Sequence, residues 1–166
     1  MKTDSHPNDS LLQQKNKLLP LIALFDGEFS LDWLVELTGM KASLILSVME
    51  EEVQKQVLVK KEPAVYIFKN IRKRDEWRHE LSDDEKTRYH RSIAAILVRE
   101  LPDDDSKALS IAHHLLQISN DWRGCQWLVR AGDIHMSAFS ADKAIACFEK
   151  ALNDLSDQRG NNEDWL

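Results

Sequence analysis

The sequence predicts a mainly α protein in two parts, first three helices with a short β-hairpin and then antiparallel helical hairpins. Apolar residues recur at helical spacing over most of the 166 residues, which include only five glycines and four prolines. The spacing shortens toward two only between residues 57 and 68. Small residues recur at fixed intervals nearer the C-terminal end. The elements follow from these three observations in order.

The first part opens with a polar segment, residues 1–10, which we expect to be a disordered tail. A first helix is expected over 11–25, where Pro20 either kinks it or marks its start. Ser30 caps a second helix, and Gly39 ends it in a position that requires a left-handed residue. A third helix begins near Lys41 and keeps its apolar residues, from Leu44 to Val53, on one face.

Two short strands follow these helices. Residues 57–59 and 65–68 predict the strands, and 61–63 predict the turn between them. Three helices followed by a two-stranded hairpin is the order of a winged helix, a helix-turn-helix variant in which 38–40 would be the turn. We therefore expect a winged-helix domain over 11–70 and a connecting helix or linker over 71–81.

The second part is predicted to consist of helical repeats over 82–158, followed by a tail over 159–166. Ser82 and Glu85 form a capping box that starts a helix running to about Leu101. Pro102 and three aspartates interrupt the chain before a helix over 106–118. A further long helix is expected to begin at Trp122.

Small residues and one aromatic residue mark the crossing of the last two helices. Gly132 precedes Ala144 by twelve residues, and Phe148 lies between Ala144 and Ala151 at steps of four and three. This spacing resembles one tetratricopeptide (TPR) repeat, a unit that binds other proteins. An ordinary helical hairpin is the alternative, because His135, Phe139 and Ser156 depart from the repeat pattern. The expected packing residues are Leu128, Ala131, Gly132, Ala144, Phe148 and Ala151.

A wider resemblance covers roughly residues 18–155. The segments that carry it are Tyr66–Asn70, Leu81–Ser82, Arg88–Ala94, Ala112–His114 and Ala131–Asp133. They look like the winged-helix-to-TPR junction of STAND-class bacterial regulatory ATPases. That resemblance implies a nucleotide-binding module upstream, a winged helix acting as an arm, and a repeat array that senses a ligand or partner. Asn70, where the family usually has histidine, and the basic run after it depart from the family.

The sequence does not predict an enzyme or a cofactor site. No G-x-x-x-x-G-K-[ST] loop occurs at any of the glycines, so the nucleotide-binding module is absent from this chain. Adjacent His113 and His114 point about 100° apart on a helix and cannot chelate one metal, which favours a packing or surface role. His79, His90 and His135 lack partners at ligand spacing. Residues 103–105 are interpreted as a solvated turn rather than a cation site.

A local excess of positive charge offers a nucleic-acid alternative. Residues 60–78 carry seven Lys or Arg side chains against three acids, in a chain of net charge −6. The candidate phosphate contacts are Lys60, Lys61, Arg72, Lys73 and Arg74. The helix that would enter the DNA groove carries Glu50, Glu51 and Glu52 and has no arginine, which argues against this use.

We therefore expect a cytoplasmic, non-catalytic regulatory fragment of a bacterial signalling or transcription-regulating TPR protein. Its partners would be another protein or neighbouring domains, and a DNA-binding transcriptional regulator is the alternative. Apolar runs such as 18–25 are too short for a membrane span, and neither cysteine has a CxxC partner. Residues 157–166 are polar and lack a capping helix, so we expect a longer repeat array or self-association through the open repeat face.

Overall fold

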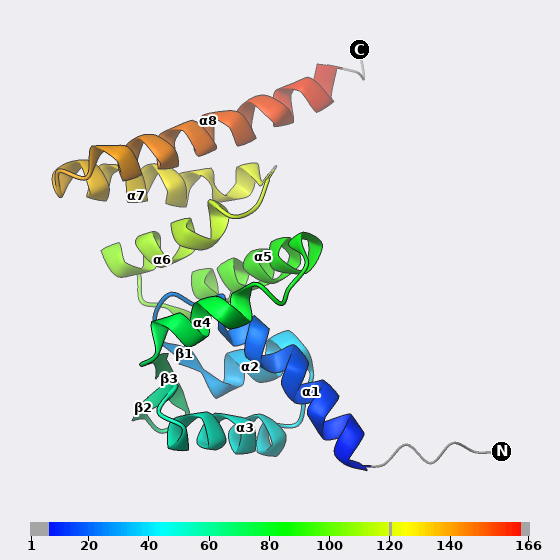
Figure 1. Ribbon diagram of the computed structural model, residues 1–166. Helices are drawn as coiled ribbons and strands as arrows, with labels where there is room; N and C mark the ends of the chain where they lie inside the picture. Colours follow the sequence, from blue (N-terminus) through cyan, green and yellow to red (C-terminus); the bar gives the residue numbers. More distant parts are fainter. Residues whose placement is uncertain (1–6, 120, 164–166) are drawn as a thin grey trace. The chain divides into compact units, whose positions relative to one another are not determined.

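The computed structural model describes residues 7–119 and 121–163, with side chains over 13–119 and 121–157. The predicted mainly α class is confirmed, and one small antiparallel sheet accompanies the helices (Figure 1). The chain divides into two compact units, residues 1–85 and 86–166. The boundary therefore falls in the first turn of helix α5 (Asp83–Glu100).

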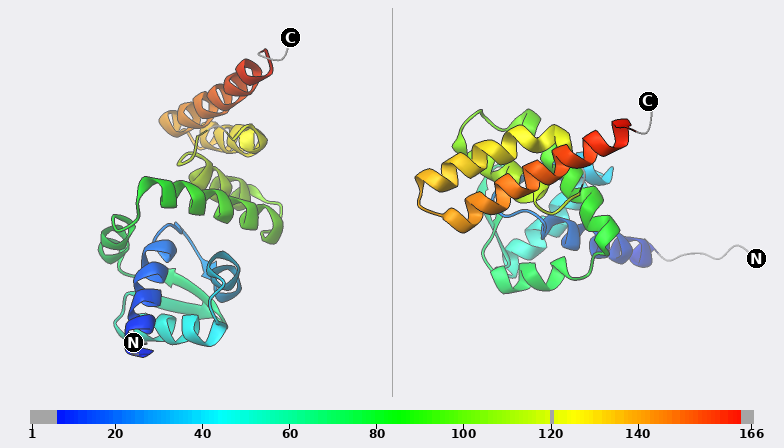
Figure 2. Two further views of the ribbon diagram at one scale, coloured as in Figure 1. Left: turned by 90° about the vertical axis from the view of Figure 1, so that its right-hand side faces the viewer. Right: turned by 90° about the horizontal axis from the view of Figure 1, so that it is seen from above.

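Unit 1 combines helices with a three-stranded sheet of order β1-β3-β2. Phe29 pairs with Tyr66 between β1 and β3, and Leu58 pairs with Phe68 between β2 and β3. Figure 2 shows this sheet beside the helices of the unit. Its elements are α1 (Pro7–Ile22), β1 (Phe29–Ser30), α2 (Leu31–Thr38), α3 (Ala42–Gln54), β2 (Leu58–Glu62), β3 (Val65–Phe68) and α4 (Ile71–Arg78).

The caps of α2 are those that the sequence predicts. The backbone N–H of Trp33 donates to the Ser30 hydroxyl at 3.2 Å, which satisfies a donor that the first turn leaves open. Gly39 has φ 67°, a left-handed conformation that glycine adopts without steric cost. Helix α3 begins just after Lys41, also as expected.

Helix α1 differs from its prediction at both ends. It begins at Pro7, runs through Pro20 and ends at Ile22. Residues 7–10 of the predicted tail are therefore helical, and residues 1–6 lie outside the described part. A proline in the first helical position loses no hydrogen bond, so Pro7 is well suited to start a helix.

The β-hairpin is longer than predicted, and strand β1 was not predicted. Strand β2 continues through Lys60 and Lys61 to Glu62, with an irregular register between Lys60 and Glu62. The turn is consequently at Pro63 and Ala64, and Ala64 has φ 66°. Exposed side chains at the end of a hairpin need not be apolar, so period-two patterning stops before the backbone pairing does.

Aromatic side chains from the sheet and its flanks fill the core of unit 1. The ring centroids of Phe25 and Phe29 are 5.2 Å apart, and Phe68 lies 6.0 Å from both Phe29 and Trp77. Such distances are typical of packed aromatic pairs. The core therefore joins β1 and β3 to α4, which makes 71–78 an integral helix of this unit.

Helices joined by short turns and loops make up the described residues of unit 2. In the capping box of α5, Ser82 N–H donates to the Glu85 carboxylate at 3.0 Å and Glu85 N–H donates to the Ser82 hydroxyl at 3.3 Å, which confirms the prediction. Helix α6 packs beside α7, and α7 packs beside α8 (Figure 2). The remaining elements are α6 (Asp105–Leu115), the 3₁₀ helix η1 (Trp122–Gly124), α7 (Cys125–Ser137) and α8 (Ala141–Glu163).

Four boundaries in unit 2 differ from the predictions, one of them the end of α6, which lies at Leu115 rather than at 118. The α-helix expected from Trp122 begins at Cys125, because a 3₁₀ turn comes first. Helix α6 starts one residue earlier than predicted, where the Asp104 carboxylate accepts from Lys107 N–H at 2.9 Å. Helix α8 continues to Glu163, so residues 159–163 of the predicted tail are helical; residues 164–166 lie outside the described part.

Candidate interaction surfaces

The six predicted packing residues all lie in the α7–α8 pair. Five of them are buried: Leu128, Ala131, Gly132, Ala144 and Ala151. Gly132 lies directly against Phe148, since a Cβ atom added at Gly132 would be 2.4 Å from the Phe148 Cε1 atom. The ring of Phe148 therefore occupies the space that any other residue at 132 would need. This close approach fixes how the two helices cross.

The two cysteines belong to the same helix pair and have no reactive character. Cys125 and Cys147 are buried free thiols. The Cys125 thiol donates to the Ala151 carbonyl at 3.4 Å. Desolvation raises the pKa of both thiols, which disfavours the nucleophilic thiolate. Their role is packing.

The predicted phosphate contacts on α4 are engaged inside unit 1. Arg74 is largely buried, and its guanidinium forms an ion pair with Asp26 at 2.9 Å. The neighbouring Arg78 guanidinium donates to the Ala23 carbonyl at 3.1 Å. Both side chains thus tie α4 to the segment that follows α1. Arg74 serves the fold rather than an open basic surface.

Arg72 and Lys73 share one acidic neighbour. The Lys73 ammonium donates to Glu76 at 2.9 Å, and the Arg72 guanidinium lies 3.6 Å from the same carboxylate. The hydrogen bond from Lys73 is the main cause of a lowered Glu76 pKa. Lys73 also lies over the Trp77 ring at 5.8 Å. The positive charge of α4 is therefore partly neutralised where it is exposed.

Lys60 and Lys61 are the candidate contacts that remain open. Both are exposed on β2. Neither forms an ion pair with any side chain that the structure describes. The adjacent Glu62, also exposed, reduces the local charge of the hairpin end.

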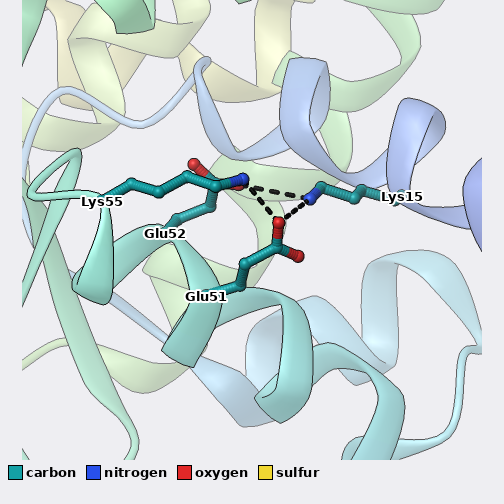
Figure 3. Close-up of polar contacts among 4 residues, drawn as sticks. All are labelled: Lys15, Glu51, Glu52 and Lys55. Atoms are coloured by element: carbon teal, nitrogen blue, oxygen red, sulfur yellow. Dashed lines mark hydrogen bonds and ion pairs between the residues drawn. The ribbon is translucent and has the colours of Figure 1, made fainter.

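The end of α3 carries a cluster of two cations and two anions (Figure 3). Lys15 of α1 lies 2.6 Å from Glu51 and 3.4 Å from Glu52. Lys55 contacts the same two carboxylates, and Glu52 is almost fully buried beneath them. Hydrogen bonds from Lys15 and Lys55 lower the Glu51 pKa to about 2, and those carboxylates raise the Lys55 pKa. The cluster links α1 to α3, and it engages the Lys55 ammonium in ion pairs within unit 1.

The exposed side of α3 is therefore poorly suited to DNA. Ser43, Ser47 and Gln54 are exposed polar residues that could contact bases. Glu50 is exposed among them and would repel phosphate groups. Lys41, just before the helix, is exposed and lies outside the cluster of Lys15, Glu51, Glu52 and Lys55.

Three histidines of unit 2 gather between α5 and α6. The Nδ1 atoms of His90 and His114 lie 2.8 Å apart in the interior, and the His113 ring is 5.1 Å from the His114 ring. His114 thus packs, in keeping with the role that the sequence favours. Among the described residues, no group of three or more His, Cys, Asp or Glu side chains has an arrangement suited to a metal ion.

The acidic run 103–105 is exposed, in keeping with the predicted solvated turn, and it also makes contacts that the sequence does not predict. Asp104 caps α6. The Arg130 guanidinium of α7 lies 2.5 Å from Asp103 and 3.5 Å from Asp105, and these contacts raise the Arg130 pKa. Sequence reasoning did not find this pairing or that of Asp26 with Arg74, because nothing local marks charges that meet only in the folded chain.

Comparison of the chain with protein-family models, curated proteins and solved structures finds no match. Over residues 7–119 and 121–163, the helices fall short of the length and apolar content needed to cross a membrane.

Proposed function

We propose that this protein is a non-catalytic interaction module of a bacterial signalling or transcription-regulating protein. In this proposal unit 1 is a winged helix that docks on other protein modules, and α7–α8 is a TPR-like hairpin that receives a partner. The observation that carries it is the seam between Gly132 and Phe148, because this small-to-aromatic contact is typical of repeat units that present a protein-binding face.

The order of elements in unit 1 supports the winged-helix part. Three helices, a short strand before the second, and a hairpin after the third give the sequence α1-β1-α2-α3-β2-β3. The hairpin pairs with the short strand through β3. Because the cations of α4 and the end of α3 are paired within the unit, its charged surface suits protein contacts better than a phosphate backbone.

The proposed mechanism is a shift between two states of docking. A partner bound to α7–α8 changes how the winged helix docks only if its affinity differs between the docked and released states. This action needs no chemistry from the chain. In this proposal the module lies in the cytoplasm, beside the nucleotide-binding module of a STAND-class regulator or an equivalent neighbour.

In-cell photocrosslinking tests this proposal. A photoreactive amino acid placed at the exposed Ser47 of α3 should yield protein adducts of defined mass, identified by mass spectrometry. The same group at the exposed Gln117, at the end of α6, is the matched control and should not yield those adducts. Nuclease-sensitive adducts from Ser47, or identical adducts from both positions, would contradict the proposal.

A DNA-binding regulator is the second candidate, and exposed Lys60 and Lys61 are the observation that favours it. Fluorescence anisotropy with duplex DNA over a salt series measures it directly. If the hairpin contacts phosphates, binding at low salt should fall steeply with salt and should weaken in a Lys60→Glu/Lys61→Glu variant. An Arg72→Glu variant is the control, because the positive charge of α4 is partly neutralised by Glu76; this substitution should weaken binding less than the change at the hairpin.

A further inference from the structure

The α7–α8 hairpin has an apolar face that its own fold leaves exposed. On α7, Val129 lies three residues before Gly132 and Met136 four residues after it, so all three share one side of the helix. Val129 is 43% exposed and Met136 is 53% exposed. Both side chains thus flank the point where Gly132 meets Phe148.

Helix α8 supplies the other half of this face. Ile145 lies three residues before Phe148, and Leu152 and Leu155 lie four and seven residues after it, again on one side. They are 51%, 65% and 40% exposed, respectively. Because Gly132 contacts Phe148, the two sets of side chains adjoin each other. We call the surface formed by Val129, Met136, Ile145, Leu152 and Leu155 the hairpin face.

Acidic side chains border the hairpin face. Asp133 lies between Val129 and Met136 at steps of four and three, and Glu149 lies between Ile145 and Leu152 at the same steps. Asp142 precedes Ile145 by three residues. All three carboxylates are exposed, and none forms an ion pair within the described part of the chain.

The cations of the hairpin do not offset this acidic border. Arg130 is engaged by Asp103 and Asp105. Lys150 pairs with the buried Asp154. Lys143 lies two positions before Ile145, which places it about 200° around the helix axis from that residue. The face is therefore apolar at its centre and negative at its edge.

We propose that the hairpin face binds an amphipathic helix of another protein, with lysine or arginine beside the apolar stripe of that helix. Two packed helices that expose side chains at spacings of three, four and seven suit a third helix as partner. The acidic border favours a partner helix that carries positive charge beside its apolar stripe. This inference rests on the proposed function and names the class of partner.

Charge argues against a second copy of the chain as the occupant. If α8 of one copy packed along α8 of another, Asp142 and Glu149 of each copy would border the same contact. Like charges beside an interface are destabilising, Arg130 and Lys150 are engaged in ion pairs, and Lys143 lies on the opposite side of α8 from Ile145. A helix with a basic border avoids this repulsion.

Peptide binding to the 166-residue chain tests the proposal. The probe is a fluorescently labelled helical peptide of three heptads with leucine at positions a and d and lysine at e and g. Its matched control has glutamate at e and g. By anisotropy at low salt, the lysine peptide should bind at least about tenfold more tightly than the glutamate peptide.

Variants locate the binding. Leu152→Asp should weaken binding of the lysine peptide at least about tenfold, since it places a charge in the centre of the apolar contact. Ile71→Asp, at a comparably exposed residue of unit 1, should leave binding unchanged. An Asp133→Lys/Glu149→Lys variant should reverse the preference toward the glutamate peptide. Circular dichroism should show that each variant remains folded.

The contrary outcomes are equally specific. Equal binding of both peptides, or binding unaffected by Leu152→Asp, would overturn the inference. A dimer in sedimentation equilibrium that Leu152→Asp dissociates would assign the face to a second copy instead. Nuclease-sensitive crosslinks from Ser47 would refute the proposed function while leaving the peptide result standing, so the two failures are distinguishable.

Discussion

His90 on α5 and His114 on α6 are joined through their Nδ1 atoms, 2.8 Å apart in the interior of unit 2. One ring must donate and the other must accept, so at least one of the two imidazoles is neutral while this bond exists. Apart from Lys107, the other buried residues of these two helices, such as Ile93 and Ile111, are apolar. It is a specific polar element of an otherwise hydrophobic core.

Replacement of His114 by alanine is expected to lower the free energy of unfolding by about 2 kcal/mol. The change removes a buried hydrogen bond and leaves a cavity, each of which costs about 1 kcal/mol or more. Urea unfolding followed by circular dichroism measures the effect. His79→Ala, at an exposed histidine of unit 1, should change stability by less than about 0.5 kcal/mol. Equal effects of the two substitutions would contradict a structural role for the pair.

Gly132→Ala is expected to destabilise the chain by about 1 kcal/mol, although alanine is the better helix former. The new Cβ would lie 2.4 Å from the Phe148 ring, which must move, and overpacking outweighs the gain in helix propensity. In a Phe148→Ala background the same substitution should stabilise instead. This reversal of sign in thermal unfolding is the test; stabilisation in both backgrounds would show that the ring does not limit residue 132.

A double-mutant cycle on Asp26 and Arg74 is expected to give a coupling energy of about 0.5–1 kcal/mol. The pair is close and the arginine largely buried, so solvent screens the interaction only in part. The variants are Asp26→Asn and Arg74→Gln, with stability measured by urea unfolding. The pair of Arg72 and Glu76 is longer and more exposed, and its cycle should give a smaller value. A larger coupling for Arg72 and Glu76 would refute the ranking.

The free energy of unfolding of unit 1 is expected to depend on pH at acidic values, because of Glu51. Its pKa falls from 4.5 to about 2 on folding, so its ion pairs contribute fully above pH 4.5 and are lost as pH falls through 2. Wild type should therefore be more stable than Glu51→Gln near pH 6, by about 1 kcal/mol or less because the carboxylate is partly exposed. The difference should shrink between pH 4.5 and 2. A difference independent of pH in this range would exclude the ionic cause.

The sequence predicts best those features that depend on residues close together in the chain. The caps at Ser30 and Gly39 and the box of Ser82 with Glu85 act within four residues, so their signals stand in the sequence itself. The small residues of the α7–α8 seam are identifiable for a similar reason, since their spacing records how closely two adjacent helices approach.

The remainder depends on contacts between distant residues. From sequence alone, Arg74 is a reasonable candidate for a phosphate contact. Its structural role becomes visible only in the fold, where it pairs with Asp26, 48 residues earlier. Strand β1 is two residues long and exists because β3 lies beside it. The acidic border of the hairpin face was also missed, because charges on exposed helical positions carry no signal until the apolar residues beside them are found to be uncovered.

Phe139, at the turn between α7 and α8, is an unfavourable residue for the stability of the hairpin. Its φ is 56°, a left-handed conformation that glycine adopts at less cost, and its side chain is 98% exposed. The isolated protein thus bears backbone strain and a solvated aromatic ring without packing in return. A glycine at 139 would ease the strain, so selection for stability alone would not retain the phenylalanine. A Phe139→Gly substitution would therefore measure directly what this turn costs the free fold.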